Sequence, residues 1–76
     1  MTTLNTVAIG GTCVVESISG DDDITIRLME MGIIPGTELK VIGVAPLGDP
    51  VELELRGYRL SIRRAEAERI EVKFEV

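Results

Sequence analysis

The segment from Arg27 to Val41, RLMEMGIIPGTELKV, constrains the fold more than any other part of this chain. Gly32 and then the pair Pro35-Gly36 divide this apolar-rich run into short pieces. Proline presets φ at the first corner of a turn, and glycine supplies the positive φ that a type II turn needs at the second corner. The segment is therefore predicted to form a short helix that ends at Gly32, a tight turn, and a strand that begins near Leu39.

The residues ahead of this turn fit two kinds of element. Ile24, Ile26 and Leu28 alternate as they do in a strand, whereas Ile24, Leu28 and Met31 lie at helical spacing. The acidic run Asp21–Asp23 supplies capping side chains and favours the positive end of a helix, and the glycine behind is a common helix terminator. Capping thus favours a helix over a strand.

Alternation of apolar and polar residues marks the strands. It is clearest at Val51, Leu53 and Leu55, after which Gly57 turns the chain into a hairpin. Five short strands and one inserted helix predict a small, mostly β barrel, a closed sheet that leaves few exposed edges. The other predicted elements are a helical or irregular lead-in at Leu4–Ile9, strands at Cys13–Ile18, 39–44, Arg59–Ile62 and Glu71–Val76 (with Val72, Phe74 and Val76 on one face), and a helical turn near 64–69.

Size and composition limit the function classes. The chain has 76 residues, which is enough for one domain, and its 45% hydrophobic content is that of a globular protein. No apolar stretch approaches the roughly 20 residues of a membrane helix, and the N-terminus lacks the basic start of a signal peptide. We therefore predict a cytoplasmic protein without membrane insertion. A net charge of −5, with one Phe and one Tyr, argues against nucleic-acid binding.

Catalytic and metal-binding motifs are missing from the sequence. The chain has no His and a single cysteine, Cys13, so it can form neither a Ser–His or Cys–His pair nor a thiolate cage; Cys13 is predicted to be a small buried residue. Asp21–Asp23 departs from the calcium-loop pattern, and no phosphate-binding loop is present. Asp49 is the one other loop acid of interest, and its expected role is turn formation. The sequence therefore predicts no enzyme activity, no cofactor and no metal site.

Two groups of residues are candidates for binding a partner. Arg63 and Arg64 belong to a cluster of arginines in an otherwise acidic chain; these are either solvated and paired with nearby glutamates or form a basic edge that meets an acidic partner. Met29, Met31 and Leu47 are either core residues or parts of an adaptable apolar groove. Helical spacing places Met31 toward the core and Met29 away from it.

The order of these motifs resembles the FeoA family. The resemblance rests on the Leu28–Thr37 run LMEMGIIPGT, on APLGDP at Ala45–Pro50 and on LSIRRAEA at Leu60–Ala67. It implies a single FeoA-like domain over residues 1–76: an SH3-like barrel of about five strands with a short inserted helix at about 23–31. It also implies an accessory or regulatory protein of ferrous-iron uptake that binds the cytoplasmic part of the GTP-binding transporter FeoB. Arg63-Arg64 matches the basic pair common in the family.

Two other functions remain as alternatives. The domain also resembles the SH3-like C-terminal module of metal-dependent transcriptional regulators, in which it would serve as a protein-interaction domain. A small carboxylate-dependent hydrolase would need two converging acids in a pocket.

Apolar surface on a barrel of this size also favours weak self-association at high concentration. How such a protein acts on the transporter, and through which contacts, is left open by the sequence.

Overall fold

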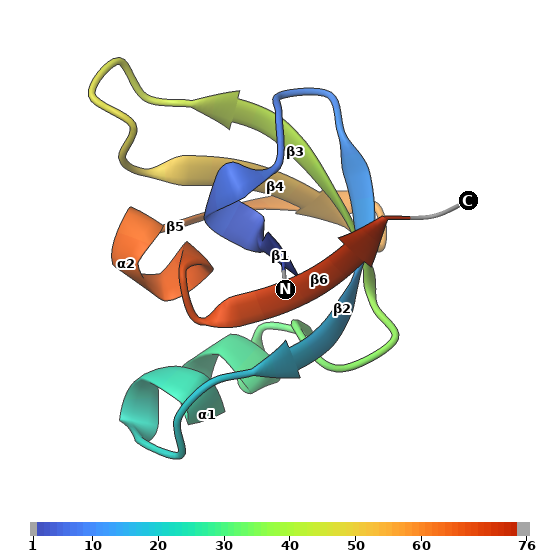
Figure 1. Cartoon of the computed structure of the whole chain (residues 1–76), viewed down its shortest axis with the longest axis vertical. Helices are drawn as coiled ribbons and strands as arrows, with labels where there is room; N and C mark the ends of the chain where they lie inside the picture. Colours follow the sequence, from blue (N-terminus) through green and yellow to red (C-terminus); the bar gives the residue numbers. More distant parts are fainter. Residues whose placement is uncertain (1, 75–76) are drawn as a thin grey trace.

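The computed structural model describes residues 2–74, and its sheet, helices and termini are shown in Figure 1. In chain order the elements are β1 (Thr2–Thr3), the 3-10 helix η1 (Leu4–Thr6), β2 (Thr12–Ile18), α1 (Asp23–Glu30), β3 (Glu38–Val44), β4 (Val51–Leu55), β5 (Tyr58–Ile62), α2 (Arg64–Ala67) and β6 (Ile70–Phe74).

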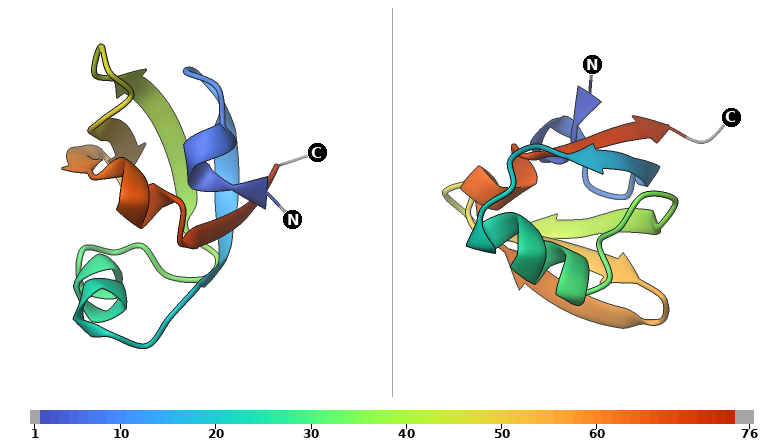
Figure 2. Two further views of the ribbon diagram at one scale, coloured as in Figure 1. Left: turned by 60° about the vertical axis from the view of Figure 1, so that its left-hand side comes forward. Right: turned by 90° about the horizontal axis from the view of Figure 1, so that it is seen from below.

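The strands form one antiparallel sheet in the order β1-β6-β2-β3-β4-β5. The sheet curls around the core, as Figure 2 shows from two further directions. Within residues 2–74, β1 and β5 stay unpaired with each other and are the two edges of the sheet. Between them run η1 and α2, which contact each other, so helical segments rather than strand pairing complete the barrel there. The predicted mostly β barrel is confirmed, with the short β1 as an additional strand.

The helix predicted at about 23–31 is present as α1. Asp22 is its N-cap, and the Asp22 Oδ1 atom accepts a hydrogen bond from the Thr25 N–H at 3.3 Å. Met31 is the C-cap, and Gly32 follows with φ +99°, so the predicted capping at both ends is confirmed. Leu28 is fully buried, because it lies on the face of α1 that covers the end of the barrel.

The predicted turn after α1 is also present. The Thr37 N–H donates to the Ile34 carbonyl at 3.0 Å, and Gly36 has φ +92°, as a type II turn requires at its third residue. The turn is bonded to β2 on both sides: the Gly36 N–H donates to the Val15 carbonyl at 2.8 Å, and the Val15 N–H donates to the Thr37 carbonyl at 2.9 Å. These bonds fix the position of α1 relative to the sheet.

The core is built from inward-facing strand residues. Val51, Leu53 and Leu55 of β4 are all buried, which confirms the alternation in the sequence. Cys13 is buried, as predicted, and pairs in register with Leu39. The other core side chains come from every part of the fold: Leu4, Val7, Val15, Leu28, Ile33, Val41, Ile62, Ala67, Ile70 and Val72.

Two strand predictions need correction. Val44 does not continue the inward face of β3: the register shifts between Val41 and Gly43, and Val44 is exposed. Such a bulge offsets the alternation by one residue. The second correction concerns the start of β6, which is Ile70 rather than Glu71. Val72 and Phe74 lie on one face as predicted, since they pair with Val15 and Cys13 of β2, although Phe74 is 54% exposed near the end of the sheet. Val76, predicted on the same face, lies outside the described residues.

The C-terminal helical turn is close to its predicted position. α2 covers Arg64–Ala67 rather than 64–69, and Glu68 is its C-cap. The carboxylate of Glu66 turns back to accept a hydrogen bond from the Arg63 N–H at 2.8 Å, and its side chain is nearly buried. A glutamate at the third helical position that bonds back to the N–H of the capping residue is one half of a capping box.

Two ion pairs join α1 to the C-terminal part of the chain. The guanidinium of Arg27 binds the Glu66 carboxylate, and Arg69 Nη1 lies 2.6 Å from Asp22 Oδ1. The hydrogen bond from Arg69 holds the pKa of Asp22 below its ordinary value of 3.8, and Asp22 in turn raises the pKa of Arg69. The Asp22 carboxylate therefore caps α1 and binds Arg69 at the same time.

We expect this double role to make stability depend on pH. Because the pKa of Asp22 is lower in the folded chain than in the unfolded one, its contribution is present above the ordinary aspartate value of 3.8 and is lost as the pH falls through the folded value. Asp22→Asn retains a capping side chain but removes the charge. In urea denaturation, the free energy of unfolding of the wild type should exceed that of Asp22→Asn at pH 7, and this difference should shrink below pH 3.8. A difference that does not depend on pH would contradict this assignment.

The β4–β5 hairpin contains strain that a substitution can relieve. Arg56 and Gly57 form its two-residue turn, and both have positive φ, +49° for Arg56. This conformation is unfavourable for an arginine and favourable for asparagine. We expect Arg56→Asn to raise the free energy of unfolding by about 1 kcal/mol, measured by urea denaturation. Arg59→Asn, in the extended conformation of β5, is the matched control and should not stabilise; a lower urea midpoint for Arg56→Asn would refute the strain argument.

Candidate functional site

The five candidate residues lie along one side of the molecule but not in one cluster. The β3–β4 loop, α2 and α1 follow one another along this side in Figures 1 and 2. Leu47 belongs to the loop, Arg63 and Arg64 lie at the start of α2, and Met29 belongs to α1. The structure thus separates an apolar region on α1 from a second region around the loop.

Met29 is on the outer face of α1. Its side chain is 45% exposed, and that of Ile26, one helical turn earlier, is 54% exposed. Together with Ile18 and Pro35 they line an open groove of about 470 Å³ between α1 and the end of β2. We call this feature the α1 groove. Ile26 was not predicted to be a surface residue, although its spacing of three from Met29 on a helix was the available signal.

Met31 is placed differently. It follows the last turn of α1, and its partly buried side chain packs against the core. Its backbone carbonyl accepts a hydrogen bond from the Tyr58 hydroxyl of β5. The core side predicted by helical spacing is therefore where Met31 lies, and it presents less surface to a partner than Met29 does.

Leu47 is at the tip of the β3–β4 loop and is 94% exposed. The loop is a tight one: the Gly48 N–H donates to the Ala45 carbonyl at 2.7 Å, and the Ala45 N–H donates to the Pro50 carbonyl at 3.0 Å. A leucine held this far into solvent contributes nothing to the core. It is the most exposed large apolar side chain among residues 2–74.

The loop is joined to α2 by Asp49. Its Oδ1 atom accepts a hydrogen bond from the Arg64 N–H at 3.0 Å, so Asp49 caps the first turn of α2 in addition to shaping its own loop. The guanidinium of Arg64 reaches back to Gly48, where the Cβ atom of any larger residue would lie 3.1 Å from Nη1. Arg63 borders a shallow depression with Asp49 and Pro50. We call Leu47 with Arg63 and Arg64 the basic tip.

The arginines divide into two groups. Arg27 and Arg69 make the ion pairs described above, and Arg59 lies 3.8 Å from Glu54, its cross-strand neighbour. Within residues 2–74, Arg56, Arg63 and Arg64 form no ion pair. The interpretation of arginines paired with nearby glutamates therefore applies to Arg59 but not to the two arginines of the basic tip, whose charge is available to a partner.

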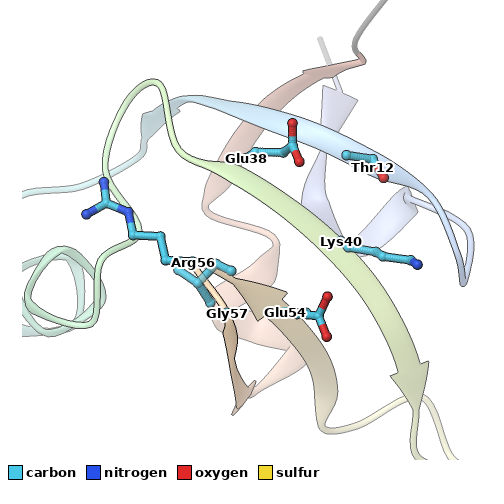
Figure 3. A pocket seen from close by; sticks show the side chains of 7 residues that line it. Thr12, Glu38, Lys40, Glu54, Arg56 and Gly57 are labelled. Carbon is cyan, nitrogen blue, oxygen red and sulfur yellow. The ribbon is translucent and has the colours of Figure 1, made fainter.

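The outer face of the sheet has a different character. Glu38 and Lys40 of β3 project on the same side as Glu54 of β4, whereas the guanidinium of Arg56 points away from them (Figure 3). Lys40 pairs in register with Glu54, and Glu54 pairs with Arg59, so charges of opposite sign alternate across β3, β4 and β5. Because the opposite charges are interspersed, this surface selects no ligand of one sign.

Acidic and sulfur side chains are scattered over the described part of the chain. No group of three or more Cys, Asp or Glu side chains in residues 2–74 is arranged to hold a metal ion. No helix within the same residues is both long and apolar enough to cross a membrane.

Comparison with solved structures identifies the fold. The structure of a FeoA-like protein from Clostridium acetobutylicum is 42% identical, with a TM-score of 0.89, and the match covers 100% of this chain and 92% of that one. FeoA from Stenotrophomonas maltophilia, described as an SH3 domain protein and complexed with zinc, is 30% identical with a TM-score of 0.84 over 96% of this chain and 91% of that one. The barrel is therefore SH3-like.

The same fold occurs in the manganese regulator SloR, with a TM-score of 0.84 at 19% identity, and in a further protein. T. acidophilum IdeR is 25% identical, with a TM-score of 0.86, and the match covers 97% of this chain but 34% of that chain. The predicted likeness to a module of metal-dependent regulators is confirmed for the fold.

Sequence comparison gives the family. The model of the FeoA domain matches residues 2–74. A curated relative, the Fe(2+) transport protein A/Fe(2+) transporter FeoB fusion protein of Porphyromonas gingivalis, is 36% identical over 64 residues, which are 84% of this chain. The chain spans only 8% of the length of that fusion protein. With a family model matching nearly its whole length, this chain belongs to the FeoA family of ferrous-iron transport.

Proposed function

We propose that this chain is a non-enzymatic accessory protein of ferrous-iron uptake that binds the cytoplasmic part of a FeoB-type transporter. The observation that carries the proposal is the fusion in P. gingivalis, where a FeoA-like segment similar to 84% of this chain is joined to FeoB. Joining two modules in one polypeptide raises their effective concentration, which is useful when they act on each other. Binding to that part of the transporter would place the chain in the cytoplasm.

The surface chemistry supports a binding role. Leu47, Arg63 and Arg64 offer an exposed apolar side chain beside two arginines that lack ion pairs within residues 2–74. Interfaces are enriched in apolar anchors and arginine, and steering by charge speeds association. We propose the basic tip as the main contact, with Met29 as a second contact and Met31 contributing its smaller exposed part. The chain has no His, so it can form neither a Ser–His nor a Cys–His nucleophile pair, which supports a binding role.

Isothermal titration calorimetry tests the proposal directly. The chain is titrated into the soluble GTP-binding domain of the transporter from the same organism and into the full transporter in detergent, each with and without guanine nucleotide. Binding to either preparation is expected. A nucleotide-dependent affinity would link the contact to the GTPase cycle, and absence of heat with both preparations, confirmed by a second method, would refute the proposal.

Substitutions then map the contact. We expect Leu47→Asp and Arg63→Glu each to weaken binding about tenfold or more, because one loses apolar burial and the other reverses a charge. Met29→Asp should have a smaller effect. Arg59→Glu, an exposed charge reversal on β5, is the matched control and should leave the affinity unchanged. If all three test variants bind with wild-type affinity and unfold thermally as the wild type does, these residues do not form the contact surface. That result would leave the identity of the partner undecided.

The likeness to IdeR favours a second candidate function. In this alternative the chain acts as an SH3-like protein-interaction module of a metal-dependent transcriptional regulator. The same calorimetric titration, with the DNA-binding part of such a regulator from the same organism in place of the transporter, separates the two functions. Binding to the regulator and not to the transporter would favour the alternative.

A further inference from the structure

The β3–β4 loop and the α1 groove offer opposite kinds of surface. The loop lies at one end of the view in Figure 1, α1 lies at the other, and α2 lies between them. The loop carries Leu47, which is 94% exposed, and the Arg64 guanidinium reaches its neighbour Gly48. Because α2 lies between the loop and α1, Leu47 is placed to enter the groove of another molecule rather than its own.

The groove is suited to one apolar side chain. Its walls are Ile18, Ile26, Met29 and Pro35, and its volume of about 470 Å³ is ample for a leucine. Ile26 and Met29 are 54% and 45% exposed, so filling the groove would remove substantial apolar surface from water. Methionine is flexible enough to adjust to the entering group.

Three carboxylates, one lining the groove and two at the ends of α1, are called the acidic rim; the Arg69 guanidinium near Gly20 is already paired with Asp22. Asp21 lines the groove, Asp23 stands in the first turn of α1, and Glu30 is the last residue of that helix. Within residues 2–74 none of these three carboxylates takes part in an ion pair, in contrast to Asp22. A cationic group close to the entering apolar side chain would therefore be attracted to this rim.

We propose that the α1 groove binds the basic tip of a second copy of this chain, with Leu47 in the groove and Arg63 and Arg64 facing the acidic rim. The occupant has chemistry that matches the groove, an exposed apolar side chain in a loop that adjoins two arginines without ion pairs. The contact is heterologous, since it uses different surfaces on the two copies, and each pair leaves a free tip and a free groove. Association therefore continues head to tail as concentration rises. The net charge of −5 on each copy opposes it, which makes the contact weak.

Sedimentation equilibrium of the full chain over a wide concentration range tests this contact. The wild-type average mass should rise with concentration and continue beyond a dimer. Leu47→Asp removes the apolar side chain of the basic tip, and Met29→Asp places a charge in the α1 groove. Each variant should weaken association about tenfold or more. Ile26→Lys is a second groove variant. Ile9→Asp is the control, because Ile9 is 64% exposed but belongs to neither surface, and it should associate as the wild type does.

Mixing the variants gives the decisive result. A Leu47→Asp chain keeps its groove and a Met29→Asp chain keeps its tip, so an equal mixture should form a complex of two chains that does not grow further. A wild type that stays monomeric throughout would overturn the proposal. Variants that associate as the wild type does would also overturn it, and so would a mixture of folded variants that stays monomeric. In the last case the groove binds some other occupant, and binding of a basic apolar peptide would show this.

Discussion

The hydrogen bonds between the Pro35-Gly36 turn and Val15 hold the rest of the structure in place. They tie the end of the α1 segment to β2, which lies between β6 and β3 near the middle of the sheet. A third bond, from the Thr37 hydroxyl to the Gly32 carbonyl at 3.0 Å, joins the turn to the end of the helix. Because the turn is bonded on both sides, α1 leaves the barrel at one fixed angle, and the groove between α1 and β2 has a defined width.

The ion pairs determine which charges remain for a partner. Arg27 and Arg69 are occupied in binding α1 to the C-terminal part of the chain. Exposed pairs of this kind contribute little stability each, but here one partner, Glu66, is nearly buried and also caps α2. Among the described residues, Arg63 and Arg64 at the start of α2 and Arg56 in the β4–β5 turn form no ion pair. Residues of the same type are thus divided between those that join elements of the fold and those whose charge stays unpaired.

Much of the fold could be predicted from local sequence. The turn at Pro35-Gly36, the caps of α1 and the alternation in β4 are determined by neighbours in the chain, and the structure confirms all three. Features that depend on distant residues could not be predicted. The strand at Thr2–Thr3 exists because it pairs with Glu71 and Val72, and the bulge between Val41 and Gly43 follows from register with β4.

The same division applies to the candidate site. Met29 and the two arginines were identified from residue type and spacing, and the structure places them on the surface. The capping of α2 by Asp49, fifteen residues earlier in the chain, has no local signal. The groove was equally hidden, since Ile18, Ile26 and Pro35 come from three separate segments that only the tertiary fold brings together. Sequence therefore located single residues better than it located the surfaces they form.

The place of β6 in the sheet has a consequence for synthesis on the ribosome. β6 lies between β1 and β2 in the sheet. The first two strands to be synthesised therefore cannot pair with β6 until this last strand has been made. Pairings between distant parts of a chain form late and slowly because a long loop must close first. The nascent chain therefore cannot complete its core until residues near 74 have left the exit tunnel. In a longer polypeptide that continues beyond this domain, the barrel would finish folding while the following segment is still being translated.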